Sequence, residues 1–403
     1  MSGGTPPRGA VAFLPGGQLL VLMALGVANH TMLSGARVAV ALDALGRGAS
    51  PALVGVLMAL FALLSMLFAI HAGRLADRIG ARRPMLWGSA GCVLAALIPA
   101  AWPGLPALFV ASSLAGFAFM AFQVPAQRVV GDLGYPRSRA ASFSWYALGF
   151  SLSGFTGPLV AGFAIDSIGF RGAFALLALF PAIACAVLAT QTVRLPRPQP
   201  HPPEGPPVAP ARGMFDLLRH PVLRRVLVLN ALFALGWDLH TIFVPIYGTA
   251  IGLSAAQIGI VLSAFAAATF IVRLAASWFS SRLPEMKTLR VALFVAAAAY
   301  VAFPFTSSAL ALALLSFLLG LGLGIGQPMV MSLLHEHAPP GRIGETVGLR
   351  MSMIQSMAVT VPIVFGALGT TVGLMPVFGS VGLCLGLGGL AARLARPSAA
   401  SVS

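Results

Sequence analysis

A few ionisable side chains lie inside the long apolar runs of this 403-residue chain, and they are the first candidates for chemistry. Asp238, within the sequence Gly-Trp-Asp-Leu-His, is the only acid well inside such a run, and Arg37 lies in the outer part of another. Charges buried in a bilayer usually face a cavity or a partner, and burial favours the neutral carboxyl group. Asp238 is therefore a candidate for proton exchange or substrate binding, and Arg37 is a second. A structural ion pair, or an Asp238 hydrated near the membrane surface, is the alternative interpretation.

Uncharged polar residues in the same runs extend the set of substrate or proton candidates. His30 and Asn29 lie near the middle of the first run, and His240 lies in the seventh. A histidine titrates near neutral pH, although a lone membrane histidine is as often a hydrogen-bonding partner between helices. Gln123 and Gln327 each precede a proline closely, and amides in lipid need partners. The two glutamines could bind a substrate, close an inner gate or join helices.

The sequence contains no pattern typical of a metal site, a cofactor site or an enzyme. His335 and His337 flank Glu336 but would point apart on a helix, and the three cysteines lie in apolar runs without metal or redox spacing. The chain shows no serine–histidine–acid set, no paired acids at one depth and no phosphate-binding loop. We therefore expect no bound metal, no cofactor and no catalysis.

Composition shows which elements must position these residues. Apolar residues make up 58% of the chain, charged residues 9%, and the mean hydropathy is +0.92. About a quarter of the residues in a typical soluble domain are charged, far more than in this chain, so a bilayer must be the solvent. Apolar runs long enough to span it occur twelve times and predict an all-α polytopic membrane protein. The predicted spans are 17–42, 52–72, 85–102, 106–130, 141–165, 172–193, 223–248, 254–278, 289–305, 308–334, 345–369 and 374–394.

The positions of arginine and lysine predict the orientation. With the N-terminus in the cytoplasm, 22 of the 25 basic residues fall on the inside, Arg273 and Arg350 among them. Only Arg37, Arg47 and Arg171 remain for the membrane or the outside. Both termini are therefore expected in the cytoplasm, with the chain in the cell inner (plasma) membrane. This distribution explains the net charge of +15 without a nucleic-acid partner.

The chain divides into two related halves. A proline-rich stretch predicts a cytoplasmic linker at 194–221, between an N-terminal six-helix bundle at 1–193 and a C-terminal bundle at 222–403. A shift of 204 residues superposes similar residues of the two halves, which indicates an internal duplication. The superposed pairs are Gly116 with Gly320, Gln123 with Gln327, Asp132 with Glu336, Pro136 with Pro340, Pro158 with Pro362, and Gly162 with Gly366.

The loop after the second span carries a family resemblance. It reads Gly-Arg-Leu-Ala-Asp-Arg-Ile-Gly-Ala-Arg from residue 73 to residue 82. This resembles the loop signature of the major facilitator superfamily, with Ala81 in place of the usual basic residue. The resemblance covers the whole chain and implies two pseudo-symmetric six-helix bundles. It also implies a conformational latch that engages the eleventh helix and an acid at the end of the fourth. The latch residues are Gly73, Asp77, Arg78, Gly80, Arg82 and Asp132.

Two further comparisons with the superfamily bear on transport direction. Gly157, Pro158 and Gly162 resemble the antiporter signature of the fifth helix, which favours export, and ordinary helix packing of small residues is the alternative. Ser112 stands where drug–proton antiporters often carry an arginine, which argues against their usual mechanism. The fold also implies that the first and seventh helices are symmetry mates, so Arg37 is a candidate ion partner of Asp238.

These features predict a secondary transporter that works by alternating access. We expect a monomer in membrane lipid, with a small-molecule substrate and protons as partners, and favour proton-coupled efflux of an organic compound or drug. Uptake of a small metabolite is the near alternative, and a non-transporting receptor or sensor on the same fold is an alternative of another class.

Overall fold

The structure is a computed structural model that describes residues 16–133, 139–190, 214–279, 284–339 and 342–393. These residues are almost entirely helical and include no strand. The N-terminal half contains α1 (Gly17–Gly46), α2 (Pro51–Ile79), α3 (Arg82–Ala101), α4 (Leu105–Leu133) and α5 (Arg139–Ala189). After the short 3₁₀ helix η1 (Met214–Arg219) come α6 (Pro221–Ala250), α7 (Ala255–Phe279), α8 (Glu285–Ala302), η3 (Phe303–Phe305), α9 (Ala309–His337), α10 (Ile343–Thr371) and α11 (Leu374–Arg393).

Helix α5 contains two membrane spans. Its 51 residues are interrupted at Gly169, whose φ of 73° lies in the left-handed region that glycine enters without strain. This break falls between the fifth and sixth predicted spans. The eleven helices of the described ranges therefore provide the twelve predicted spans, and the all-α, twelve-span fold is confirmed.

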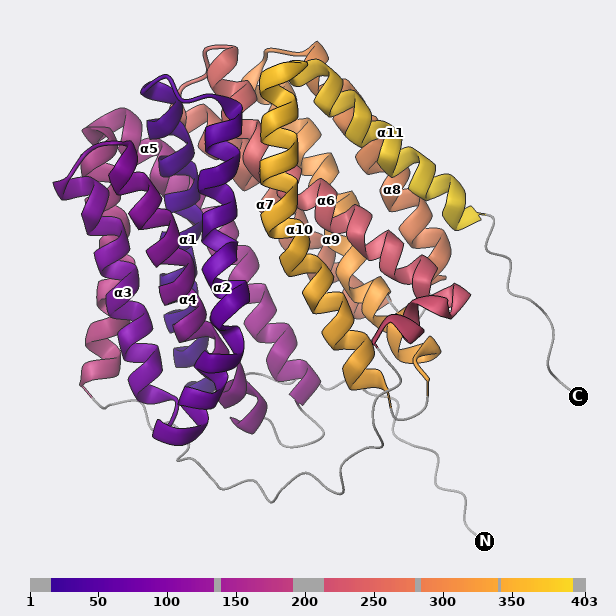
Figure 1. The fold of residues 1–403 in the computed structure, drawn as a ribbon, viewed down its shortest axis with the longest axis horizontal. Helices are drawn as coiled ribbons and strands as arrows, with labels where there is room; N and C mark the ends of the chain where they lie inside the picture. Colours follow the sequence, from indigo (N-terminus) through magenta and orange to yellow (C-terminus); the bar gives the residue numbers. More distant parts are fainter. Residues whose placement is uncertain (1–15, 134–138, 191–213, 280–283, 340–341, 394–403) are drawn as a thin grey trace, which may run out of the picture.

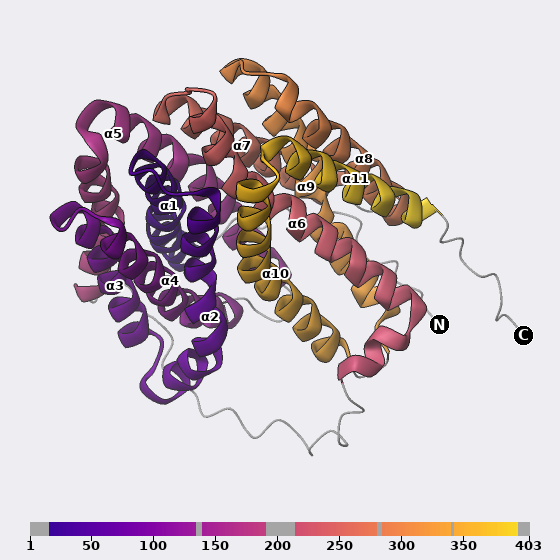
Figure 2. The ribbon, with the colours of Figure 1, turned by 45° about the horizontal axis from the view of Figure 1, so that its top comes forward.

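The helices form two bundles that meet at one end of the molecule (Figures 1 and 2). Contacts between the bundles are made mainly by α5 with α7 and by α2 with α10. We call the end where α1 joins α2 and α6 joins α7 the closed face, and the opposite end, where α2 joins α3, the open face. Figure 1 shows the closed face at the top, with the bundles diverging below it.

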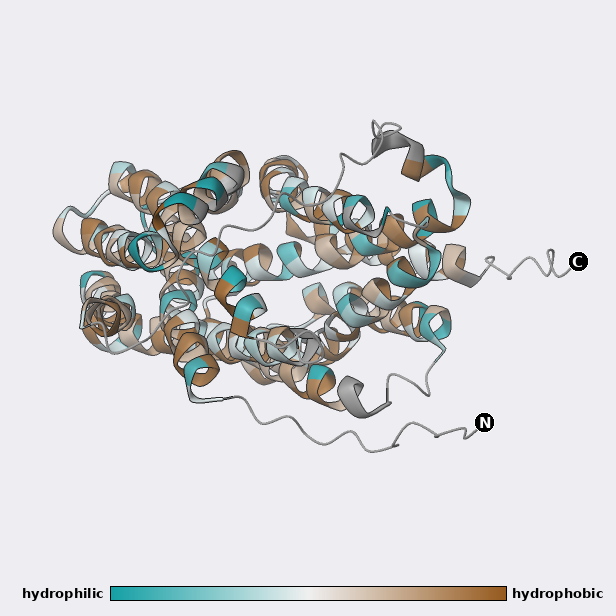
Figure 3. Cartoon of the chain, turned by 90° about the horizontal axis from the view of Figure 1, so that it is seen from below, coloured by the Kyte–Doolittle hydropathy of each residue, from teal (hydrophilic) through white to brown (hydrophobic). Residues whose placement is uncertain are grey.

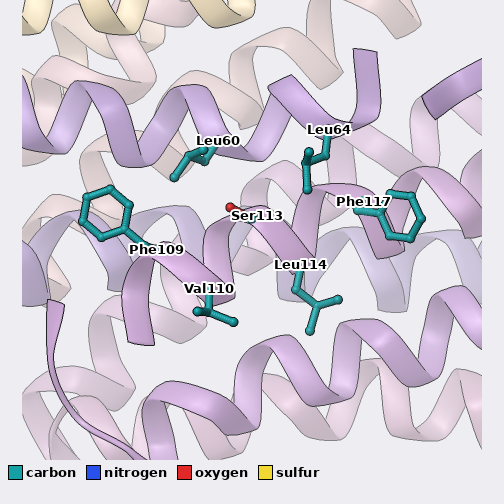
Figure 4. A pocket seen from close by; sticks show the side chains of 7 residues that line it. All are labelled: Leu60, Leu64, Phe109, Val110, Ser113, Leu114 and Phe117. Carbon is teal, nitrogen blue, oxygen red and sulfur yellow. The ribbon is translucent and has the colours of Figure 1, made fainter. Parts of the chain in front are cut away.

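The surface of the bundles suits a lipid environment. Large apolar side chains are exposed on many helices, as at Leu94, Ile183 and Leu310. Hydrophobic residues, drawn in brown, appear on many helices in the hydropathy view from below (Figure 3). Leu60 and Leu64 of α2 and Phe117 of α4 help to line an apolar surface groove of about 510 Å³, whose single hydroxyl-bearing residue is Ser113 (Figure 4). Apolar surface of this extent is stable only against lipid or another apolar partner.

The 204-residue repeat reappears as repeated contacts within each half. A Cβ atom at Gly116 would lie 2.0 Å from the carbonyl oxygen of Phe61, and one at Gly320 would lie 2.4 Å from that of Phe265. Both partners of the second pair are shifted by 204 residues from those of the first. The glycines therefore mark the same backbone contact, α2 with α4 and α7 with α9.

The same shift relates the contacts that seal the closed face. A Cβ at Gly55 of α2 would lie 2.1 Å from the carbonyl oxygen of Pro362 in α10, and one at Gly259 of α7 would lie 2.5 Å from that of Pro158 in α5. These approaches join opposite halves backbone to backbone. Since glycine alone leaves room for such contacts, the sequence places glycine where the halves must meet.

Side-chain caps complete the closed face in the same symmetric pattern. The Asp166 carboxylate of α5 accepts hydrogen bonds from the backbone N–H groups of Ala255 (3.1 Å) and Ala256 (2.8 Å) at the start of α7. The Thr370 hydroxyl of α10 accepts one from the N–H of Ala52 at the start of α2 (3.0 Å). Thr370 lies 204 residues after Asp166, and Ala256 lies 204 residues after Ala52. Each half thus caps a helix N-terminus of the other.

Arg273 and Arg350, which the orientation argument counts among the inside basic residues, lie in helices rather than in loops. Arg273 lies in the last two turns of α7 and faces the space between the halves. Arg350 in α10 is 2% exposed, and its Nε donates to Asn230 Oδ1 of α6 at 2.9 Å. Both residues lie within spans, where a buried partner can hold a guanidinium, so they do not belong in a count of loop charges.

Candidate functional site

A cavity of about 510 Å³ lies between the two halves. Its wall is built from α1, α4, α5, α6, α7, α9 and α10, so both halves contribute. Such a volume holds a molecule of metabolite or drug size. The polar lining residues are His30, Ser34, Arg37, Gln123, Gln127, Tyr146, Ser151, Trp237, His240, Thr241, Thr269, Arg273 and Gln327.

His30 is held in the N-terminal half by a hydrogen bond and by aromatic rings. Its Nδ1 lies 2.6 Å from Ser153 Oγ of α5. Phe150 packs edge-on against the imidazole at 4.8 Å between ring centroids, and Phe119 of α4 lies at 5.4 Å. The predicted candidate His30 therefore faces the cavity with a fixed orientation.

His240 has a comparable setting in the C-terminal half. Its Nε2 lies 2.9 Å from Ser316 Oγ of α9, and its ring stacks on Phe265 at 4.3 Å. Its Nδ1 is buried without a hydrogen-bond partner. Trp237, one turn earlier in α6, packs edge-on against the same phenylalanine at 4.8 Å. This wall offers flat apolar faces with few polar groups.

Arg273 joins the two halves across the cavity. One terminal nitrogen donates to Ser151 Oγ of α5 at 3.0 Å, and the other donates to Gln327 Oε1 of α9 at 3.1 Å. The guanidinium lies 5.5 Å from the ring centroid of Trp237, within cation–π range. The sequence prediction missed this residue, although its position inside the predicted span 254–278 was a usable signal.

Arg37 and Asp238 interact electrostatically but form no direct ion pair. The Asp238 charge acts on Arg37, and the Arg37 charge acts on Asp238. Arg37 lines the cavity with its guanidinium 5.5 Å from the centroid of the Phe61 ring. Its Nε is buried without a hydrogen-bond partner. Asp238 is half-buried and is not among the lining residues.

The remaining predicted candidates divide into two groups. Gln123 and Gln327 both line the cavity, which places one duplicated amide in each half. Asn29 is fully buried away from it, and its Nδ2 donates to the carbonyl of Leu25 in its own helix at 2.9 Å. Asn29 Oδ1 has no partner. Asn29 is thus a helix-interior amide rather than part of the cavity wall.

The proposed latch lies at the open face. Gly80 ends α2 with φ of 83°, a conformation that glycine suits, and Arg78 is exposed just before it. Arg82 begins α3 and donates to the carbonyl of Leu188. Asp132 at the end of α4 lies 3.9 Å from Arg128 of the same helix. The side chains at Gly73 and Asp77 lie outside the described residues, so latching stays a prediction.

The antiporter-like motif packs helices together. A Cβ at Gly157 would lie 2.7 Å from the carbonyl oxygen of Thr31 in α1, and one at Gly162 would lie 2.4 Å from that of Ala255 in α7. Pro158 is a lining residue of the cavity. The motif therefore serves both the core of the first half and the closed face.

Comparison with known proteins agrees with this geometry. The family description that matches residues 19–362 is the Major Facilitator Superfamily, and the chain belongs to it. It is accordingly a multi-pass membrane transporter of that superfamily.

Individual relatives are similar over different extents. The tetracycline resistance protein, class B, of Escherichia coli is 34% identical over 110 residues, 27% of this chain and 27% of that protein. The match thus spans about a quarter of that relative's length. A solved peptide transporter (POT) superposes with a TM-score of 0.78 and 19% identity over 96% of both chains.

A bacterial homologue of the human lysosomal transporter Spinster, inward-facing and unoccupied, superposes with a TM-score of 0.74 and 16% identity, covering 93% of this chain and 96% of that one. At such identities these solved structures establish the fold alone.

Proposed function

We propose that this transporter exports a small organic compound by alternating access, coupled to protons, with its open face in the cytoplasm. The observation that carries the proposal is the cavity between two halves whose symmetric backbone contacts, among the described residues, lie at the closed face. Rocking the halves about this cavity would open one face as it closes the other. The basic residues at the open face, Arg74 and Arg78 near the end of α2 among them, support the cytoplasmic assignment.

Export is supported by the partial likeness to a tetracycline resistance protein and by the resemblance of Gly157, Pro158 and Gly162 to the antiporter signature. Proton coupling is supported by Asp238, an acid within a span that lies in the field of Arg37. A carboxyl group there can gain and lose a proton as the halves move and its distance to the arginine changes.

A growth screen tests direction. Deletion and overexpression strains are compared on a panel of toxins and of single carbon sources. Resistance that follows expression supports export, and a growth defect of the deletion strain on one nutrient replaces export with uptake.

Flux in proteoliposomes tests transport and coupling. A compound found in the screen is expected to cross only when protein is present, faster with an imposed pH gradient. Asp238→Asn is expected to remove the pH response. Binding without any flux would favour a receptor, and undiminished pH-driven flux by Asp238→Asn would exclude this residue as the coupling acid.

A further inference from the structure

The charge of the cavity wall is one-sided. Two arginines, Arg37 and Arg273, line it, and no aspartate or glutamate is among its described lining residues. Asp238, the acid that acts on Arg37, is not among these lining residues. Two cations facing one space repel each other, and burial in a membrane protein strengthens that repulsion. A cavity lined, in the described residues, by two cations and by no acid attracts an anion.

Hydrogen-bonding capacity points the same way. A guanidinium has five N–H donors, and carboxylate is its best-matched partner. Arg37 Nε is buried without a partner, and no hydrogen bond from this side chain to the described residues is present. Arg273 bonds two neutral acceptors, Ser151 Oγ and Gln327 Oε1. A charged acceptor would bind either arginine more strongly than these neutral groups do.

The rest of the wall suits an apolar body. Trp237 and Phe265 present ring faces in the C-terminal half, and Phe150 and Tyr146 lie edge to face at 5.0 Å in the N-terminal half. Aromatic walls bind flat apolar groups through area and quadrupole geometry. The chemistry of the wall therefore combines an anion-binding pair with aromatic surfaces.

We propose that the substrate is an amphipathic organic anion, a carboxylate with an aromatic or apolar body, whose negative group is bound by Arg37 and Arg273. This inference rests on the proposed transport function and specifies its substrate class. Binding at Arg273 would also compete with its bond to Ser151 of the other half. Occupancy would thereby weaken one polar link between the halves, which ties substrate binding to their movement.

Calorimetric titration of the purified protein tests the inference with three probes that share one ring system: 2-naphthoate, 2-naphthamide and 2-naphthylmethylamine, in low-chloride buffer. Naphthoate is expected to bind about tenfold or more tightly than either other probe, because a charge-assisted hydrogen bond is stronger than a neutral one. This comparison of the three probes needs only the wild-type protein. Equal or tighter binding of the amide or the amine, or no naphthoate binding at millimolar concentration, would overturn the inference.

Variants then assign the binding to the cavity. Arg273→Gln and Arg37→Gln are each expected to weaken naphthoate binding about 10- to 150-fold. Arg273→Lys should retain part of the affinity, because it keeps the charge but not the planar fork. The matched control is Arg224→Gln, which removes an exposed arginine at the start of α6. Equal loss in the control, or unchanged binding in both cavity variants, would contradict the assignment.

Flux separates this inference from the function on which it rests. Naphthoate binding without movement across proteoliposomes would keep the anion site and refute transport of this class. If the amine or the amide crosses the membrane and naphthoate does not, transport stands and the anion site is refuted.

Discussion

Removing the Asp166 carboxylate should open the closed face. In the described state it accepts two backbone hydrogen bonds at the N-terminus of α7, which belongs to the other half. Once the halves separate there, water replaces the hydrogen bonds between Asp166 and the first turn of α7. A helix cap contributes about 0.5–2 kcal/mol, and a carboxylate near a helix N-terminus adds a further 0.3–1 kcal/mol or so. Because Asp166 is exposed, we take a net value of about 1–2 kcal/mol.

That free energy converts to a measurable population. Asp166→Ala should raise the ratio of open to closed molecules at this face about 5- to 30-fold. Thr370→Val, which removes the symmetric neutral cap, should raise it about 2- to 5-fold. Asp166→Asn should fall between the wild type and alanine, because an amide oxygen still accepts a hydrogen bond without the charge.

Electron–electron double resonance between spin labels at Gly46→Cys and Ala250→Cys measures the ratio. These positions end α1 and α6 at the closed face, both are exposed, and a Cβ at Gly46 meets nothing within 4 Å. The three native cysteines are replaced first. The result should be a larger population at long distance in Asp166→Ala.

Ser167→Ala is the matched control, since this hydroxyl donates only to Phe163 and Ala164 carbonyls of its own helix. A distance distribution unchanged by Asp166→Ala, or an equal shift in Ser167→Ala, would refute the reasoning.

Three further outcomes test other parts of the structure. Gly55→Ala should prevent full closure, because the alanine Cβ would lie 2.1 Å from a backbone oxygen of α10. The spin-label pair at positions 46 and 250 should then report a longer distance. Gly348→Ala, which has open space around its Cβ, is the control and should leave that distance unchanged. Arg350→Gln should lower thermal stability by about 1–3 kcal/mol, measured as a melting shift, through loss of its buried bond to Asn230. Asp77→Asn should impair transport while the protein still reaches the membrane; normal flux by inserted protein would remove the latch hypothesis.

The sequence predicted the spans well because the relevant information is local. Each run is apolar over the thickness of a bilayer, which is a property of consecutive residues and can be read from the sequence directly. Even the break at Gly169 fell in the gap between predicted spans. The internal repeat was equally readable, since glycines and prolines at backbone contacts, such as Gly162 and Pro362, tolerate few replacements.

The sequence could not show in the same way which polar residues face the cavity. Which side of a helix meets the cavity depends on its neighbours, and a span in a two-bundle protein touches lipid, its own bundle and the other half at once. Asn29 and His30 are adjacent in sequence, yet His30 lines the cavity while Asn29 does not. Hydropathy treats the two residues alike.

Arg273 shows how the orientation argument hid part of the site. Counting basic residues by side assigns each arginine near the end of a span to the loop, which is right for a topological signal and wrong for this residue. In the structure it is the one described side chain with hydrogen bonds to both a residue of α5 and a residue of α9 across the cavity. A guanidinium within a span needs partners that lipid cannot supply. Its presence inside the run 254–278 therefore indicates that this span faces a polar interior. The duplication sharpens the point. Residue 69, its counterpart 204 positions earlier, is alanine, so the cation is an addition to one half of a symmetric scaffold. In the proposed transport cycle both halves rock, which accounts for the closed-face contacts that they share, and the cavity that differs between them would recognise an asymmetric substrate.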